Sequence, residues 1–224
     1  MRPGGLNRIG SIALAAALVG WSNVVLPRLE SSSRCRTLVN GAVGVGLTAM
    51  AARRYRPGEL GLAPRDLPRG VRVGAVASAL PAAGFLIAAG IPAVRSRFRS
   101  SRPREDFFEW VVVHIPIGTV LAEELMFRSV LSAVLRSAWP EKQALAIHAV
   151  TFGLWHVHPA RAAGDNILGT VAFTGAVAAL FEALRARGNG VIAPALLHLT
   201  VNVGGAVLTR AAAVDWIYAS PPTR

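Results

Sequence analysis

Long uncharged stretches alternate with short arginine-rich stretches along the chain. A helix rises 1.5 Å per residue and a bilayer core is about 30 Å thick, so these apolar stretches predict helices that cross or enter a membrane. The predicted helices cover residues 9–27, 37–52, 73–94, 107–136, 143–160, 166–181 and 188–209. Two of them, 37–52 and 166–181, have only sixteen uncharged residues each. We expect these two to be partly embedded rather than fully spanning.

The intervening segments predict surface loops. Residues 53–72 are rich in proline, glycine and arginine, and residues 95–104 carry five arginines. With seven spans, these two loops fall on opposite sides of the membrane. The two sides collect twelve and eleven Lys and Arg residues, so the positive-inside rule gives no orientation. We also expect a kink at Pro81 and close helix packing at the glycines of 37–52.

The composition agrees with this pattern. Of the 224 residues, 53% are hydrophobic and 16% are charged, which is typical of a multi-pass membrane protein. We therefore predict an all-α membrane helix bundle in which residues 1–224 form one integral-membrane domain. The first stretch, after Arg2 and Arg8, also has the form of a signal peptide. The apolar character of the rest of the chain favours a retained first span.

The net charge of +12 comes from 23 Arg and one Lys against 12 acidic residues. The arginines cluster in the gaps between apolar stretches, where they meet lipid headgroups. The sequence pattern shows no basic face interleaved with aromatic residues, so it does not predict nucleic-acid binding. Arginine-rich, lysine-poor composition is typical of a bacterial chain, so we expect the plasma membrane. Cys35 is the one cysteine, which excludes an internal disulfide and an all-cysteine metal site.

Three charged residues lie mid-way along the stretch 107–136, namely Glu123, Glu124 and Arg128. A charge at the bilayer centre costs roughly 2.5–3.5 kcal/mol, so such residues usually face a protein interior and belong to a working site. Glu124 and Arg128 are four residues apart and can form an ion pair. Glu123 points about 100° away and has no local partner. This carboxylate therefore favours a functional interpretation over a purely structural ion pair.

Polar residues recur on two later helices. Phe152 and His156 are four residues apart, and the last helix repeats Gly190, Pro194, His198 and Asn202 at the same interval. All these groups can be buried together if the polar faces of the helices at 107–136, 143–160 and 188–209 line one cavity. His114 and His148 are expected to be structural or at the cavity edge, and His158 to be solvated near a membrane surface. The five tryptophans lie mostly near the ends of the stretches and fit an interfacial belt.

The chemistry that suits these groups is hydrolysis by an activated water. A buried carboxylate beside a second carboxylate is a stronger base than a free one, and an imidazole helps to hold the water. Acyl transfer also needs donors for the developing oxyanion, and His198 and Asn202 share one helical face. No Ser–His–Asp or Cys–His arrangement and no phosphate-binding loop stands out in the pattern.

The ordered motifs E-E-x-x-x-R at 123–128, F-x-x-x-H at 152–156 and H-x-x-x-N at 198–202 resemble the CAAX-protease and bacteriocin-processing family. These are intramembrane endopeptidases related to the Ras-converting enzyme. The loop G-E-L-G-L at 58–62 is also similar, and the catalytic core would be about 107–205.

The resemblance implies a glutamate-dependent endopeptidase that needs no metal or cofactor and cleaves a membrane-associated peptide or protein. Glu123 would activate the water with His156, and Glu124 and Arg128 would orient that site. His198 and Asn202 would form the oxyanion hole.

Two alternatives stay open at this point. Glu123, His156 and His198 could instead bind Zn²⁺ as three ligands with an open position, although the H-E-x-x-H signature is missing. The chain could also be a non-catalytic scaffold or immunity protein that binds a peptide in the same cavity.

Overall fold

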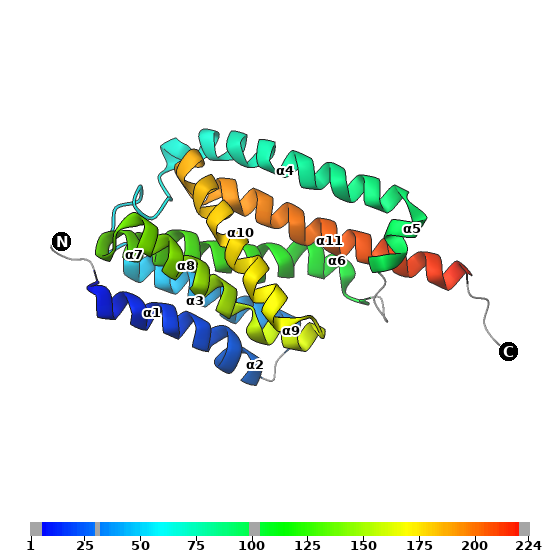
Figure 1. Cartoon of the computed structure of the whole chain (residues 1–224), viewed down its shortest axis with the longest axis horizontal. Coiled ribbons are helices and arrows are strands. Elements are labelled where there is room, and N and C mark those ends of the chain that lie inside the picture. The colour runs from blue at the N-terminus through cyan, green and yellow to red at the C-terminus, as the bar shows by residue number, and fades with distance from the viewer. Residues whose placement is uncertain (1–5, 30–31, 99–103, 220–224) are drawn as a thin grey trace.

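The structure is a computed structural model that describes residues 6–29, 32–98 and 104–219, and within these ranges it is helical without any strand (Figure 1). The predicted all-α class is confirmed. The first long helix consists of α1 (Arg8–Gly20), a π-helical turn (Trp21–Val25) and α2 (Leu26–Arg28). It is followed by α3 (Ser33–Ala51), a 3₁₀ turn (Pro64–Asp66), α4 (Leu67–Gly90), α5 (Pro92–Arg95) and a second 3₁₀ turn (Ser96–Phe98).

The fourth long helix, Phe107–Ala138, is called here the central helix. It begins with α6 (Phe107–Glu109), continues through π-helical segments at Trp110–Leu121 and Glu124–Leu131, and ends with α7 (Ser132–Ala138). The remaining elements are α8 (Glu141–Trp155), α9 (Val157–Ala163), α10 (Ile167–Gly188) and α11 (Ile192–Ala219).

Five helices are long and apolar enough to cross a membrane, which confirms a multi-pass bundle. They are Arg8–Arg28, Pro64–Gly90, Phe107–Ala138, Ile167–Gly188 and Ile192–Ala213. The sixth predicted helix is thus longer than expected, because α10 continues for seven residues beyond Phe181. The fifth is shorter than expected, because α8 ends at Trp155.

Two predicted loops are partly helical. The segment 53–72 becomes helical at Pro64, and 95–104 begins inside α5. Prolines are compatible with these helices because Pro64 and Pro68 occupy the first turns. There the missing N–H would have no helical partner anyway, so proline is tolerated. The α4 helix also continues through Pro81 without interruption.

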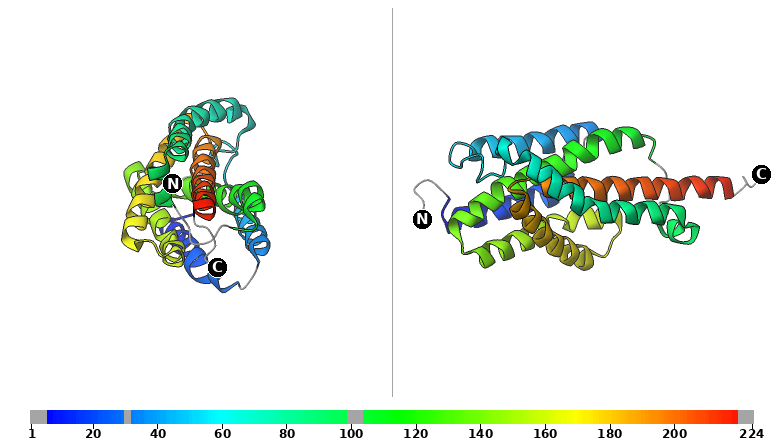
Figure 2. Two further views of the ribbon diagram at one scale, coloured as in Figure 1. Left: turned by 90° about the vertical axis from the view of Figure 1, so that its right-hand side faces the viewer. Right: turned by 90° about the horizontal axis from the view of Figure 1, so that it is seen from above.

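The central helix is the hub of the bundle. Half of the residues in its most apolar 18-residue segment are buried inside the protein, compared with 6% in the corresponding segment of Pro64–Gly90. Its side chains form one core with α1, α8 and α10. The α3 helix packs on it closely at Gly44, where an added Cβ would lie 3.1 Å from the Ala122 backbone. The α4 and α11 helices run side by side along the opposite edge (Figures 1 and 2).

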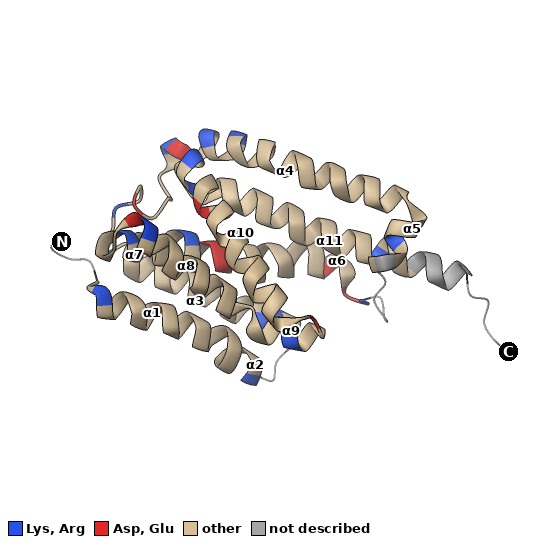
Figure 3. Cartoon of the chain, viewed as in Figure 1, with Lys and Arg blue, Asp and Glu red and all other residues tan. Residues whose placement is uncertain are grey.

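The connections gather at the two ends of the bundle, where most of the charged side chains also lie (Figure 3). The loop before α4, the start of α8 and the α10–α11 turn lie at one end, called here the α7 end. Residues 91–98, α9 and the start of the central helix lie at the other end, called here the α9 end. The two predicted loops are therefore at opposite ends, as expected.

The α10–α11 turn locks onto the loop at 58–62. Gly61 has a φ of +69°, and the Val191 N–H donates to its carbonyl over 3.0 Å. Gly190 has no space for a side chain, because an added Cβ would lie 2.6 Å from that same carbonyl oxygen. Since α11 begins at Ile192, Gly190 lies in this turn and not on the helical stripe that contains Pro194. The contact fixes where α11 enters the bundle.

Candidate active site

His198 joins the two glutamates of the central helix. Its Nδ1 lies 3.0 Å from Glu124 Oε1, and its Nε2 lies 3.9 Å from Glu123 Oε2. All three residues are buried. The two carboxylates reach opposite nitrogens of one imidazole even though they are neighbours in sequence. They lie where the two π-helical segments meet, and such wide turns are frequent at functional sites.

Arg128 completes this buried cluster. The predicted ion pair with Glu124 is present, with Nη1 3.7 Å from Oε1. The guanidinium is fully buried between two aromatic rings, 4.1 Å from the centre of Phe152 and 4.6 Å from that of Phe181. The ring faces stabilise the cation where water cannot reach it. Phe152, expected to be only core, therefore also holds the site arginine.

Glu123 faces a different environment from Glu124. The indole N–H of Trp155 donates to Glu123 Oε1 over 3.2 Å, while Oε2 is buried without a hydrogen-bond partner. Trp155 is itself 3% exposed, so it does not belong to the expected interfacial belt. Its role could not be derived from the sequence, although it directly precedes His156. One Glu123 oxygen is thus anchored and the other is available.

A cavity of about 290 Å³ leads from Glu123 to the α9 end of the bundle. Its wall includes the polar side chains of Thr37, Asn40, His114 and Thr119. Asn40 is fixed by two hydrogen bonds, accepting from the Trp21 indole over 2.9 Å and donating to the Gly118 carbonyl over 2.6 Å. A cavity of this size has space for several water molecules beside the carboxylate.

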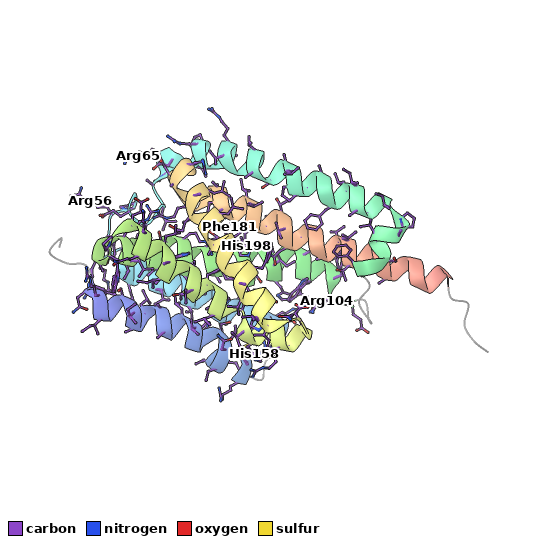
Figure 4. The ribbon with its side chains drawn as sticks, viewed as in Figure 1. Arg56, Arg65, Arg104, His158, Phe181 and His198 are labelled. Carbon is purple, nitrogen blue, oxygen red and sulfur yellow. The ribbon has the colours of Figure 1, made fainter. Side chains whose placement is uncertain are left out.

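The mouth of this cavity carries exposed residues, namely Arg36, Arg104 and Pro159. Arg104 donates two hydrogen bonds of 2.9 Å to Asp106 and lies 4.0 Å above the Trp110 ring. Its hydrogen bonds lower the pKa of the Asp106 carboxyl. Arg104 and His158 lie toward this end in Figure 4, far from Arg56 and Arg65.

His156 and Asn202 are less closely joined to the cluster. His156 lies at the break between α8 and α9, and its Nδ1 is 2.8 Å from the Phe152 carbonyl oxygen. Asn202 donates from its amide to the His198 carbonyl over 3.0 Å. Among the described residues, neither forms a hydrogen bond or ion pair with a glutamate. The structure therefore gathers Glu123, Glu124, Arg128 and His198, and leaves the other two at the periphery.

A second polar network lies behind the cluster, toward the α7 end. Glu182 accepts from Ser132 over 2.9 Å and from Arg136 over 3.0 Å. His148 Nε2 lies 3.5 Å from the same carboxylate. This network explains why α10 extends past the uncharged stretch, since its carboxylate is paired across helices. His148 is buried and structural, as expected.

Arg185 connects this network to the site. It is buried, and it donates from Nε to the Arg128 carbonyl and from Nη2 to the Glu59 carbonyl over 2.6 Å. It therefore ties α10, the 58–62 loop and the central helix together at the site arginine. In the sequence, the charge of Arg185 was the only sign of this connecting role. Because Arg185 lies beyond the predicted helix at 166–181, the pattern indicated only that the span had ended.

The metal alternative needs Glu123, His156 and His198 in one group. Within the described ranges, no three His, Cys, Asp or Glu side chains form a group that could hold a metal ion. The arrangement of the described donors therefore does not favour the zinc alternative.

Residues 106–204 match the family model described as "Type II CAAX prenyl endopeptidase Rce1-like". The matched segment, 99 of the 224 residues, is similar to the Rce1-like family. The matched segment holds all six candidate site residues and extends from the start of the central helix into α11. No curated protein and no solved structure gives a significant match to the chain.

The match to the Rce1-like family model supports the relationship that the three motifs predicted. It indicates a CAAX-type protease, a hydrolase that works in the bilayer on membrane-associated substrates. The five apolar helices agree with an integral membrane protein.

Proposed function

We propose that this Rce1-like protein is a glutamate-dependent endopeptidase in which Glu123 activates the attacking water. The observation that carries the proposal is the difference between the contacts of the two neighbouring carboxylates, Glu123 and Glu124. Glu124 Oε1 contacts both His198 and Arg128, whereas Glu123 lines the cavity that opens toward the α9 end. A general base must reach the water that it deprotonates, and Glu123 is the carboxylate placed to do so.

In the proposed reaction, a water in the cavity donates a proton to Glu123 and its oxygen attacks the carbonyl carbon of the scissile peptide bond. The resulting tetrahedral intermediate carries a negative oxygen. Collapse of the intermediate breaks the C–N bond, and the proton moves from Glu123 to the leaving nitrogen. The products are a carboxylate and an amine, so no other reactant is consumed.

His156 would help to hold the water. Its Nδ1–H donating to the Phe152 carbonyl leaves Nε2 as an acceptor, because a neutral imidazole carries one hydrogen. Nε2 could then accept from the water while Glu123 takes the other proton. The position of His156 at the α8–α9 break supports this role, since a side chain there is not confined to one helical face.

His198 and Asn202 are proposed as donors to the oxyanion, with Glu124 and Arg128 as positioning residues. Glu124 accepts a hydrogen bond from Nδ1 and so orients the imidazole with Nε2 facing the reacting carboxylate. In the proposed step His198 is an imidazolium with a hydrogen on each ring nitrogen, because only then can Nε2 also donate to the oxyanion. The Asn202 amide now donates to the His198 carbonyl. To reach an oxyanion it must leave that carbonyl, which a bound substrate would induce by offering a stronger acceptor.

The proposed substrate is a membrane-associated peptide or protein whose cleaved segment enters from the α9 end. The cavity mouth at Arg36 and Arg104 supports this direction. The arginine-rich composition supports a bacterial plasma membrane as the location, where a prenylated substrate is not expected.

The test compares Glu123→Gln with Glu141→Gln in purified full-length protein. Each variant is incubated with a peptide library, and cleavage is followed by mass spectrometry. Glutamine keeps an acceptor for Trp155 but cannot act as a base, so we expect cleavage to fall by roughly 10²–10⁴-fold. Glu141 is exposed at the start of α8, away from the cavity, and its variant should retain wild-type activity.

Two outcomes would overturn the proposal. Cleavage by Glu123→Gln at the wild-type rate would remove the glutamate as the base. Loss of wild-type cleavage in chelator, with recovery on adding Zn²⁺, would replace the glutamate mechanism by a metal-dependent one.

A further inference from the structure

A second cavity, of about 680 Å³, opens at the α7 end between the loop before α4 and the end of α10. It lies at the opposite end of the bundle from the cavity mouth that leads to Glu123, so it is not part of the candidate active site (Figures 1 and 4). Four arginines line it beside two acidic residues, Glu59 and Asp66; the arginines are Arg56, Arg65, Arg136 and Arg185. This concentration of guanidinium groups at a membrane surface needs an explanation.

Two of the four arginines are already committed. Arg185 is buried and donates to two backbone carbonyls, and Arg136 is paired with Glu182 over 3.0 Å. These contacts form a fixed, positively charged floor. Because these contacts hold Arg136 and Arg185 in place, this part of the cavity wall does not depend on flexible side chains.

The other two arginines have positive charge to spare. Arg65 lies 3.9 Å from Asp66 but its side chain is 84% exposed. The Arg56 guanidinium is exposed and forms no ion pair with any described residue. Asp66 is also engaged by Asn189, whose amide donates to it over 3.4 Å. Both arginines line the cavity and lie at the same end of the bundle in Figure 4.

An apolar cavity of about 280 Å³ adjoins the arginine cavity. Asp66 lines both, so the two cavities meet at this residue. The walls of the second cavity include Leu62, Leu67 and Ile192, and Leu67 is 50% exposed on the outer surface of α4. A charged pocket joined to an apolar one suits a molecule with an anionic head and a hydrocarbon tail.

We propose that this two-part site binds one phospholipid with an anionic headgroup. The phosphate lies between Arg56 and Arg65, because a guanidinium binds phosphate oxygens through two parallel hydrogen bonds. The beginning of an acyl chain lies along Leu62 and Leu67. Basic pockets at the ends of membrane helices bind anionic headgroups in this way. The bound lipid would also brace the 58–62 loop, whose Glu59 carbonyl accepts from Arg185.

The test titrates purified full-length protein, in nonionic detergent, with short-chain phosphatidylglycerol. Phosphatidylcholine with the same chains supplies the uncharged comparison, and inorganic phosphate and glycerophosphoglycerol supply the anion without chains. The variant is Arg56→Gln/Arg65→Gln. The matched control is Arg28→Gln/Arg161→Gln, which removes the same charge from exposed positions at the α9 end.

We expect the variant to bind phosphatidylglycerol roughly 30-fold more weakly, or about fivefold for each arginine lost, and the control to bind it as the wild type does. Thermal unfolding without lipid should be the same for both pairs, because all four side chains are exposed. If the control pair weakened phosphatidylglycerol binding equally, the lipid would be attracted by the overall positive charge of the protein. That result would overturn the proposed site. Equal affinity for phosphatidylcholine would remove the anionic headgroup from the proposal. Displacement of the lipid by inorganic phosphate at equal concentration would make this a site for a soluble anion.

Discussion

Replacing Arg128 with methionine would remove the cation from beside Glu124 while keeping an unbranched side chain between two rings. Arg128 is fully buried, and removing one partner of a buried pair costs about 3–5 kcal/mol. Glu124 keeps its contact with His198 at 3.0 Å, which places the loss near the lower limit. The sulfur contacts with Phe152 and Phe181 recover part of the lost cation–π attraction. A net loss of about 3 kcal/mol corresponds to a melting temperature lowered by roughly 6–12 °C.

The assay is thermal unfolding of the purified protein in one detergent, which needs no substrate. The control is Arg136→Met in the same helix, whose partner Glu182 lies 3.0 Å away. The Arg136 side chain is 47% exposed, and the Glu182 side chain, which is 8% exposed, keeps its hydrogen bond from Ser132, so we expect a smaller loss than for Arg128→Met. We also expect Arg128→Met/Glu124→Gln to be more stable than Arg128→Met alone, because the double change leaves no buried charge unpaired.

The reasoning fails if Arg128→Met unfolds at the same temperature as Arg136→Met. That result would mean that the buried ion pair and the two ring contacts contribute no more to stability than the partly exposed Arg136–Glu182 pair. A double variant less stable than Arg128→Met would refute the claim that the unpaired Glu124 is the source of the loss.

Two further changes test the site and its support. Asn202→Ala should lower peptide turnover by roughly 10²–10³-fold with little change in substrate affinity, as expected when one oxyanion donor is removed; unchanged turnover in the steady-state kinetics would exclude that role. Gly44→Ala should destabilise the protein by about 1–3 kcal/mol in thermal unfolding, because the new methyl group meets the Ala122 backbone at 3.1 Å. Gly46→Ala, with no atom within 4 Å of its added Cβ, is the matched control and should be neutral or slightly stabilising; equal losses would show that the close approach at Gly44 is unimportant.

The sequence predicted the features that depend on a single helix. The central helix was expected at 107–136 and ends at Ala138, and the Glu124–Arg128 pair follows from a four-residue interval. The convergence of His198 on the two glutamates was also expected, because buried polar groups need partners. These inferences rest on period and burial, which one sequence contains.

The features that the sequence did not reveal depend on packing between helices. The uncharged stretch of α10 stops at Phe181, but the helix continues because Ser132 and Arg136 satisfy the Glu182 carboxylate. Likewise, Trp155 turns inward only because Glu123 is there to accept its N–H. A pattern of charges along one helix cannot identify a partner on another helix.

The cavity at Glu123 has a consequence for how the protein works in a cell. Under the proposed mechanism, the mouth at the α9 end means that the direction in which the chain inserts decides which compartment supplies the scissile peptide. The same molecule inserted the other way round would present its carboxylate to the opposite compartment. In sealed vesicles with random insertion, a substrate added only outside would reach about half of the molecules until detergent opened the rest. Topology in the membrane is therefore itself a determinant of substrate choice.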